Sequence, residues 1–144
     1  MADKNQRIVL ASRPQGWVTE DNFRLEETPV PEPKAGEVLV RNHYLSLDPY
    51  MRGRMNAGKS YSAPVEIGDV MVGGTVGEVV ASNDPAFKPG DKVVGRLGWQ
   101  LYSVATAPVL TKVDGSQVPL SAYLGPVGMP GVTAWIGTYE ICQP

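Results

Sequence analysis

Apolar and polar residues alternate in short runs along most of the first 113 residues, and glycine and proline separate the runs. Side chains of a strand point alternately to the two faces of a sheet, so alternation with period two is typical of half-buried strands. The pattern predicts strands at residues 8–11, 23–29, 37–44, 70–81, 93–95, 101–105 and 109–113. Tight turns are expected at residues 31–36 and 87–91, where proline and glycine cluster.

Seven or eight short strands at regular spacing favour a mainly β fold, a closed or partly open β-barrel with short helices. Sixteen glycines and thirteen prolines in 144 residues point the same way, because they favour turns over long helices. Gly73, Gly74 and Gly77 interrupt a valine-rich run, which indicates a bulge or a close approach of two backbones. A barrel corner explains these glycines without any ligand.

Helical spacing appears only near the end of the sequence. Residues 119–124 suit a short helix, and residues 130–142 a longer one with Pro130 near its start. Its apolar side chains repeat at helical spacing and predict one buried face, which in a complete protein would pack at the interface between two domains: Val132, Trp135, Ile136 and Tyr139. Cys142 is expected to be a packed helix residue. We interpret residues 1–125 as one domain and residues 126–144 as a hinge segment leading out of it.

Composition excludes several classes of protein. The net charge is −2, with 13 basic and 15 acidic residues interspersed, so no basic stripe for nucleic acid is present. The sequence has no run of eighteen apolar residues, so no membrane-spanning helix is predicted. The N-terminus lacks the apolar core of a secretory signal. A single cysteine fits a cytoplasmic location. Arg52 and Arg54 form a close basic pair, either as a solvated rim or as a weak attraction for a cofactor phosphate.

The segment at residues 45–55 is the strongest candidate for a site. It follows the strand predicted at residues 37–44 and ends it abruptly, with Asp48 as the expected cap of a short helix and Pro49 as its first residue. Tyr50 then lies at the rim of the sheet, where its phenol can hydrogen-bond a ligand. The alternative is a surface turn with a packed tyrosine.

The residues offer little for metal or nucleophilic catalysis. A catalytic zinc needs three ligands drawn mainly from Cys, His and carboxylates, but the sequence holds one histidine, His43, and one cysteine. His43 lies within a predicted strand and is interpreted as an ordinary sheet residue. No Gly-x-Ser-x-Gly elbow selects a nucleophilic serine. Once metal and nucleophilic catalysis are set aside, the remaining kind of catalysis is one in which a bound cofactor carries the chemistry.

Four motifs occur in order: Asp-Pro-Tyr at 48–50, Ser-Tyr-Ser at 60–62, Gly-Asp-Val-Met-Val-Gly-Gly-Thr at 68–75 and Gly-Met-Pro-Gly-Val-Thr-Ala at 128–134. With them the chain resembles, over residues 7–144, the zinc-independent medium-chain reductases that use NADPH. Within these it is similar to the alkenal, prostaglandin and curcumin double-bond reductase branch. The resemblance implies a GroES-like barrel whose hinge helix leads to a nucleotide-binding Rossmann domain, which these 144 residues lack.

The resemblance also implies roles for particular residues. Tyr50 and Tyr61 match substrate-side tyrosines, whereas Met129 and Thr133, with Pro49, match the side of the nicotinamide cofactor. Tyr61 as an exposed loop residue and Met129 as hinge packing remain alternatives. The tyrosine that holds the substrate oxygen from the other wall lies in the nucleotide half and has no counterpart here.

We therefore expect the substrate-binding N-terminal domain of an NADPH-dependent oxidoreductase that reduces the C=C bond of α,β-unsaturated carbonyl compounds. By itself the chain is expected to be inactive, and the full-length enzyme a homodimer. The alternatives are a quinone reductase domain, or a stand-alone GroES-like binding module without catalysis. Gly74 departs from the plant alkenal branch, which carries an aromatic residue there, so a wider pocket for a small apolar enone or quinone is expected.

Overall fold

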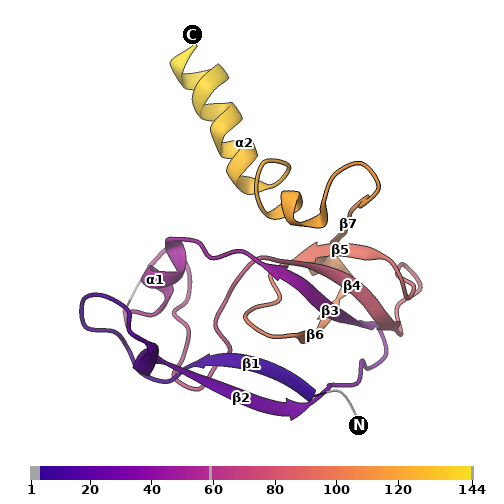
Figure 1. Cartoon of the computed structure of the whole chain (residues 1–144), viewed down its shortest axis with the longest axis horizontal. Helices are drawn as coiled ribbons and strands as arrows, with labels where there is room; N and C mark the ends of the chain where they lie inside the picture. The colour runs from indigo at the N-terminus through magenta and orange to yellow at the C-terminus, as the bar shows by residue number, and fades with distance from the viewer. Residues whose placement is uncertain (1–3, 59, 144) are drawn as a thin grey trace.

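The computed structural model describes residues 4–58 and 60–143, which form a small β domain and a helix that projects from it (Figure 1). The strands are β1 (Lys4–Leu10), β2 (Phe23–Pro29), β3 (Glu37–Leu45), β4 (Thr75–Ser82), β5 (Lys92–Gly95), β6 (Tyr102–Thr106) and β7 (Leu110–Lys112). The helices are α1 (Tyr50–Arg54), α2 (Met129–Trp135) and the π-helix η4 (Ile136–Cys142), with short 3-10 turns η1 (Glu20–Asn22), η2 (Ala107–Val109) and η3 (Leu120–Leu124).

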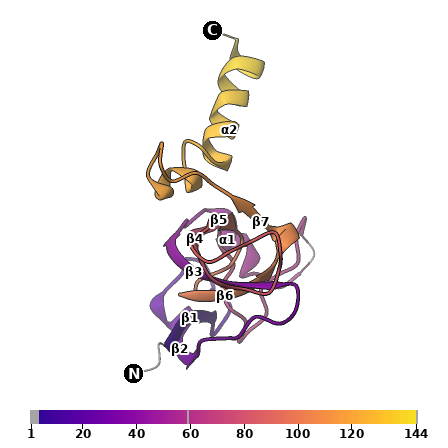
Figure 2. The same ribbon diagram turned by 90° about the vertical axis from the view of Figure 1, so that its right-hand side faces the viewer.

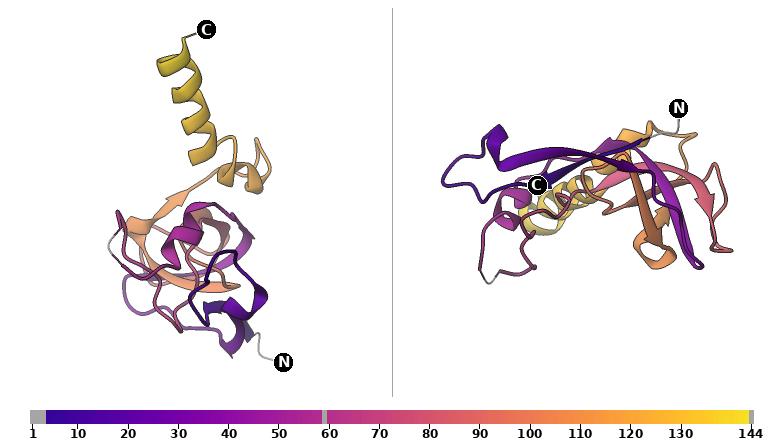
Figure 3. Two further views of the ribbon diagram at one scale, coloured as in Figure 1. Left: turned by 90° about the vertical axis from the view of Figure 1, so that its left-hand side faces the viewer. Right: turned by 90° about the horizontal axis from the view of Figure 1, so that it is seen from below.

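The strands form two antiparallel sheets. Five of them pair in the order β6-β3-β4-β5-β7, while β1 and β2 pair with each other. The two sheets are joined through the backbone: Ile8 N–H donates to the carbonyl of Trp99 at 2.8 Å, and Leu101 N–H donates to the carbonyl of Gln6 at 2.9 Å. The curled arrangement seen in Figures 1 and 3 confirms the predicted mainly β fold, a partly open barrel.

Two apolar clusters fill the interior. One lies within the five-stranded sheet and contains Val38, Val40, Val79, Val93, Leu97, Ala105 and Leu110. The other lies beneath α1 and contains Leu10, Met51, Met55, Val65 and Met71. Because α1 contributes Met51, at 3% exposure, to this second cluster, the helix is fixed on the barrel at one end of the sheet.

The close approach predicted for the glycines occurs at Gly77. A β-carbon added there would overlap the backbone carbonyl of Arg41 on β3, and the β3–β4 register shifts between Asn42 and Tyr44. This bulge bends β3, as a barrel corner requires. The strand predicted to start at residue 70 starts instead at Thr75, because residues before it bond elsewhere: Trp99 N–H donates to the carbonyl of Met71 at 2.8 Å.

The helix predicted at residues 130–142 is present as α2 and η4, and the apolar face that is expected to pack between two domains in a complete protein is uncovered in this chain. The prediction that Cys142 is packed is wrong. Val132, Trp135, Ile136 and Tyr139 are all exposed, by 44 to 63%, and Cys142 is exposed as well. Figures 1 and 2 show the reason: the helix extends away from the sheets, and within the described residues no strand packs along it. Pro144, the last residue of the predicted hinge, lies outside the described residues. None of the helices described is long and apolar enough for a bilayer crossing.

We predict that Gly77→Ala destabilises the domain, because its methyl group would meet a backbone carbonyl that β3 cannot move without losing sheet hydrogen bonds. Overpacking of this kind costs about 1 to 3 kcal/mol in the free energy of unfolding, measurable by urea denaturation. Gly53→Ala in α1 is the matched control, since nothing lies within 4 Å of its added carbon. Equal stability of the two variants would contradict the close approach.

We also predict that the chain self-associates through α2 and η4, because Trp135 and Tyr139 form an exposed aromatic pair on the helix, with ring centroids 5.8 Å apart. Trp135→Glu should lower the sedimentation coefficient at high protein concentration toward the monomer value. Leu25→Glu on β2, also a charge placed on an exposed apolar residue, should leave it unchanged. A monomeric wild-type chain at high concentration would rule the prediction out.

Candidate functional site

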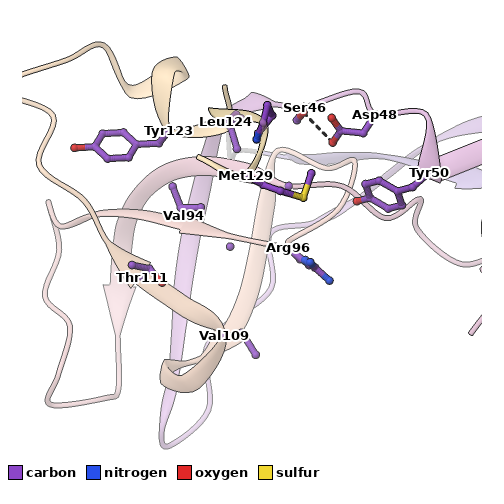
Figure 4. Close-up of a pocket in the computed structure, with 13 residues that line it drawn as sticks. Ser46, Asp48, Tyr50, Val94, Arg96, Val109, Thr111, Tyr123, Leu124 and Met129 are labelled. Carbon is purple, nitrogen blue, oxygen red and sulfur yellow. Dashed lines mark hydrogen bonds between the residues drawn. The ribbon is translucent and has the colours of Figure 1, made fainter. Parts of the chain in front are cut away.

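A cavity of about 530 Å³ opens where the ends of several strands meet the first turn of α2 (Figure 4). One row of paired residues crosses β3, β4, β5 and β7, and the cavity lies beside this row. The row consists of Leu45, Thr75, Gly95 and Leu110. Its walls are formed by Ser46, Asp48, Tyr50, Gly74, Val94, Gly95, Arg96, Val109, Thr111, Tyr123, Leu124, Met129 and Pro130. Residues from both ends of the sequence therefore share one largely apolar pocket.

Tyr50 is held by the end of β3 and the start of α1. Ser46 N–H donates to the carbonyl of Gly74 at 2.9 Å, and Met51 N–H to the carbonyl of Asp48 at 3.1 Å. The expected cap is wrong: Pro49 precedes the helix, and the Asp48 carboxylate accepts a hydrogen bond from the Ser46 hydroxyl at 2.9 Å instead of bonding the helix backbone. The hydroxyl of Tyr50 points into the cavity toward Met129 (Figure 4).

The Tyr50 phenol is a neutral hydrogen-bond donor over the physiological range. Its pKa is raised above the ordinary tyrosine value, first because burial disfavours the phenolate and second because the Asp48 carboxylate repels it. Arg96 and Arg54 oppose this rise, and Tyr61 adds slightly to it. A donor that stays protonated suits a ligand oxygen on which negative charge develops.

The structure brings two of the predicted site residues together. Tyr50 and Met129 both line the cavity, whereas Pro49, Tyr61 and Thr133 do not. Tyr61 is 84% exposed on its loop, and the Thr133 hydroxyl donates to the carbonyl of Met129 at 2.8 Å. The ligand-binding roles assigned to all five residues remain predictions.

Arg52, considered above as a rim or phosphate-attracting residue, has structural partners. Its guanidinium donates to the carbonyl of Gly16 at 2.8 Å, to the carbonyl of Pro14 at 3.3 Å and to Asn56 Oδ1 at 2.6 Å. These bonds tie the loop after β1 to α1. The side chain therefore braces the helix that carries Tyr50.

Several residues of the wall were not identified from the sequence: Val94, Arg96, Val109, Thr111, Tyr123 and Leu124. A signal for Arg96 was present, since it directly follows the strand predicted at 93–95. Two strands that both pair antiparallel with β4 run in the same direction, so the ends of β3 and β5 lie at one edge of the sheet. Thr111 and Tyr123 belong to β7 and η3, whose place could not be read from local pattern.

Metal ligands do not gather anywhere in the described part of the chain: no three His, Cys, Asp or Glu side chains there lie close enough to hold an ion. His43 lies on β3 with its Nε2 3.7 Å from the Glu78 carboxylate, as expected for a sheet residue. The cavity thus offers the phenol of Tyr50, one carboxylate, one guanidinium and an apolar wall, together with the hydroxyls of Ser46 and Thr111. The hydroxyl of the second tyrosine of the wall, Tyr123, donates to the carbonyl of Asp114 at 2.6 Å.

Many known proteins are similar to this chain in sequence or in fold. The family described as the N-terminal domain of oxidoreductase matches residues 6–113. An NADPH-dependent curcumin reductase from Escherichia coli is 53% identical over 98% of this chain, and a tobacco (Nicotiana tabacum) 2-alkenal reductase (NADP(+)-dependent) is 39% identical over 97%. The crystal structure of CurA with NADPH from Vibrio vulnificus superposes with a TM-score of 0.88 at 50% identity, over 96% of this chain and 41% of that one.

These relatives are longer proteins, since the chain spans 41 to 42% of the two curated sequences. The matched region includes the barrel, and the sequence identity to these relatives is high enough to show common ancestry as well as a common fold. The resemblance read from the four motifs is confirmed. This chain belongs to the family of oxidoreductase N-terminal domains.

Proposed function

We propose that the chain is the substrate-binding part of an NADPH-dependent reductase acting on the C=C bond of α,β-unsaturated carbonyl compounds. One observation carries the proposal: the Tyr50 hydroxyl and the Met129 side chain face each other across one apolar cavity. The relatives named for curcumin and 2-alkenal reduction support the same class of substrate.

The residues of the cavity suit the reduction of an enone. Adding hydride to the carbon β to a carbonyl places negative charge on the carbonyl oxygen, and a neutral phenol in a largely apolar site stabilises that charge. Tyr50 would donate its hydrogen bond to this oxygen. Val94, Val109 and Leu124 would exclude water from the conjugated chain and fix its orientation. Gly74, which lacks a side chain at the wall, would leave the pocket wider than an aromatic residue there would.

The residues at the start of α2 fit one end of the cofactor. Met129 and Pro130 present an apolar wall that suits the flat face of a nicotinamide ring. Met129 and Thr133, with Pro49, would hold that end. When bound, NADPH supplies the hydride. The sequence contains no Gly-x-Gly-x-x-Gly turn for the cofactor phosphates, so these residues would hold the nicotinamide end alone.

The projecting helix supports a division of the chain at residue 125. We infer that residues 1–125 are the substrate domain and that residues 126–144 lead toward a nucleotide-binding domain, against which the exposed face of α2 and η4 would pack. For the full-length enzyme we propose a zinc-free, cytoplasmic homodimer. Tyr61 would contact a long substrate from its exposed loop.

Replacing the phenol tests the proposal. Tyr50→Phe should weaken the binding of benzylideneacetone by about two- to tenfold, the value of one hydrogen bond. Calorimetry on the chain measures this in a Cys142→Ser background, because the single, exposed thiol adds to conjugated carbonyls. Tyr44→Phe, on β3 outside this cavity, is the matched control. If Tyr50→Phe and Tyr44→Phe bind alike, the phenol does not hold the carbonyl.

The pKa of Tyr50 predicts how this binding depends on pH. The phenol must be protonated to donate, and its pKa is raised, so affinity should be flat from about pH 6 to about pH 9 and fall only above about pH 10. The ligand is uncharged throughout. Tyr50→Phe should remove the fall at high pH while leaving the plateau flat. A loss of affinity in the wild-type chain below about pH 9 would contradict a protonated Tyr50 donor.

A further inference from the structure

Arg96 is the one cation among the described residues that line the cavity, and the mechanism above makes no use of it. Its side chain is exposed, and no ion pair or hydrogen bond of its guanidinium occurs within the described residues. The one carboxylate of the wall, Asp48, is bonded to the Ser46 hydroxyl. The guanidinium therefore has no carboxylate paired with it among the described residues.

The backbone fixes Arg96 in its place. Gly95 before it pairs with Thr75 on β4 and with Leu110 on β7, and Leu97 after it is buried at 8% exposure. Both neighbours of Arg96 are buried, whereas its own side chain is exposed and lines the cavity. Arg96 is thus placed by the sheet and not by a free loop.

Arg96 and Tyr50 line the same cavity. The charge of Arg96 acts on the Tyr50 hydroxyl more strongly than that of Arg54 does. In the view of Figure 4, Arg96 and Asp48 lie on opposite sides of the line from Met129 to Tyr50.

We propose that Arg96 is a specificity-determining residue that selects α,β-unsaturated carbonyl substrates carrying a carboxylate. A guanidinium presents paired N–H donors whose spacing matches the two oxygens of a carboxylate. This inference rests on the proposed function and names its substrate class: an acidic enone, with its carbonyl at Tyr50 and its carboxylate at Arg96. A phosphate of the cofactor is the other source of a matching anion.

The test compares (E)-3-benzoylacrylic acid with its methyl ester, which share the enone and differ in charge. Calorimetry on the 144-residue chain in the Cys142→Ser background should give a Kd for the acid at least about threefold below that for the ester at low salt. The preference should shrink as salt is added. Arg96→Gln should abolish it, Arg96→Lys should keep part of it, and Arg41→Gln, an exposed arginine of β3, should keep it all.

Each other outcome overturns the inference. If Arg96→Gln binds the acid as tightly as the wild type does, the arginine does not select a carboxylate. If instead the same variant weakens only NADPH binding, Arg96 serves a cofactor phosphate. When Tyr50→Phe weakens the ester but Arg96→Gln changes nothing, this inference fails and the proposed function stands. If the wild-type chain binds neither ligand at millimolar concentration, both fail.

Discussion

The pairing of β3 with β4 is the constraint on which the rest of the molecule depends. β3 is the one strand of the described chain that pairs with both β4 and β6, and the backbone of β4 approaches it so closely at Gly77 that no side chain fits between them. Beside that approach the register of β3 on β4 shifts between Asn42 and Tyr44, just before β3 ends at Leu45. The segment from Ser46 to Tyr50 is therefore placed by a contact some distance away from the cavity itself.

The cavity joins segments that are far apart in the sequence. Its phenol comes from α1, its guanidinium from the end of β5 and its thioether from the first residue of α2. The sheet fixes one side of the cavity, because four residues paired in one row lie beside it. The two charged groups of the wall have different status: Asp48 is engaged by a hydroxyl, and Arg96 remains available to a ligand.

Much of the fold could be read from the sequence, because strands in a half-exposed sheet must alternate and turns need glycine or proline. The site was only partly readable: the motifs around Tyr50 and Met129 located two walls, whereas Thr111 and Tyr123 depend on which strands become neighbours. Helical spacing showed that α2 has an apolar face but not whether anything covers it. Asp48 was misjudged as a cap because a serine two residues earlier competes for its carboxylate.

The Arg52 guanidinium, bonded to the carbonyls of Pro14 and Gly16, has a consequence for how this family of sequences can vary. Surface loops ordinarily accept insertions, because their length is not tied to anything else. Here the Arg52 side chain of α1 is bonded to the loop after β1, so a change in the length of that loop would shift α1. Residues 11–19 and α1 are thus expected to change together in evolution, although they lie more than thirty residues apart in the chain.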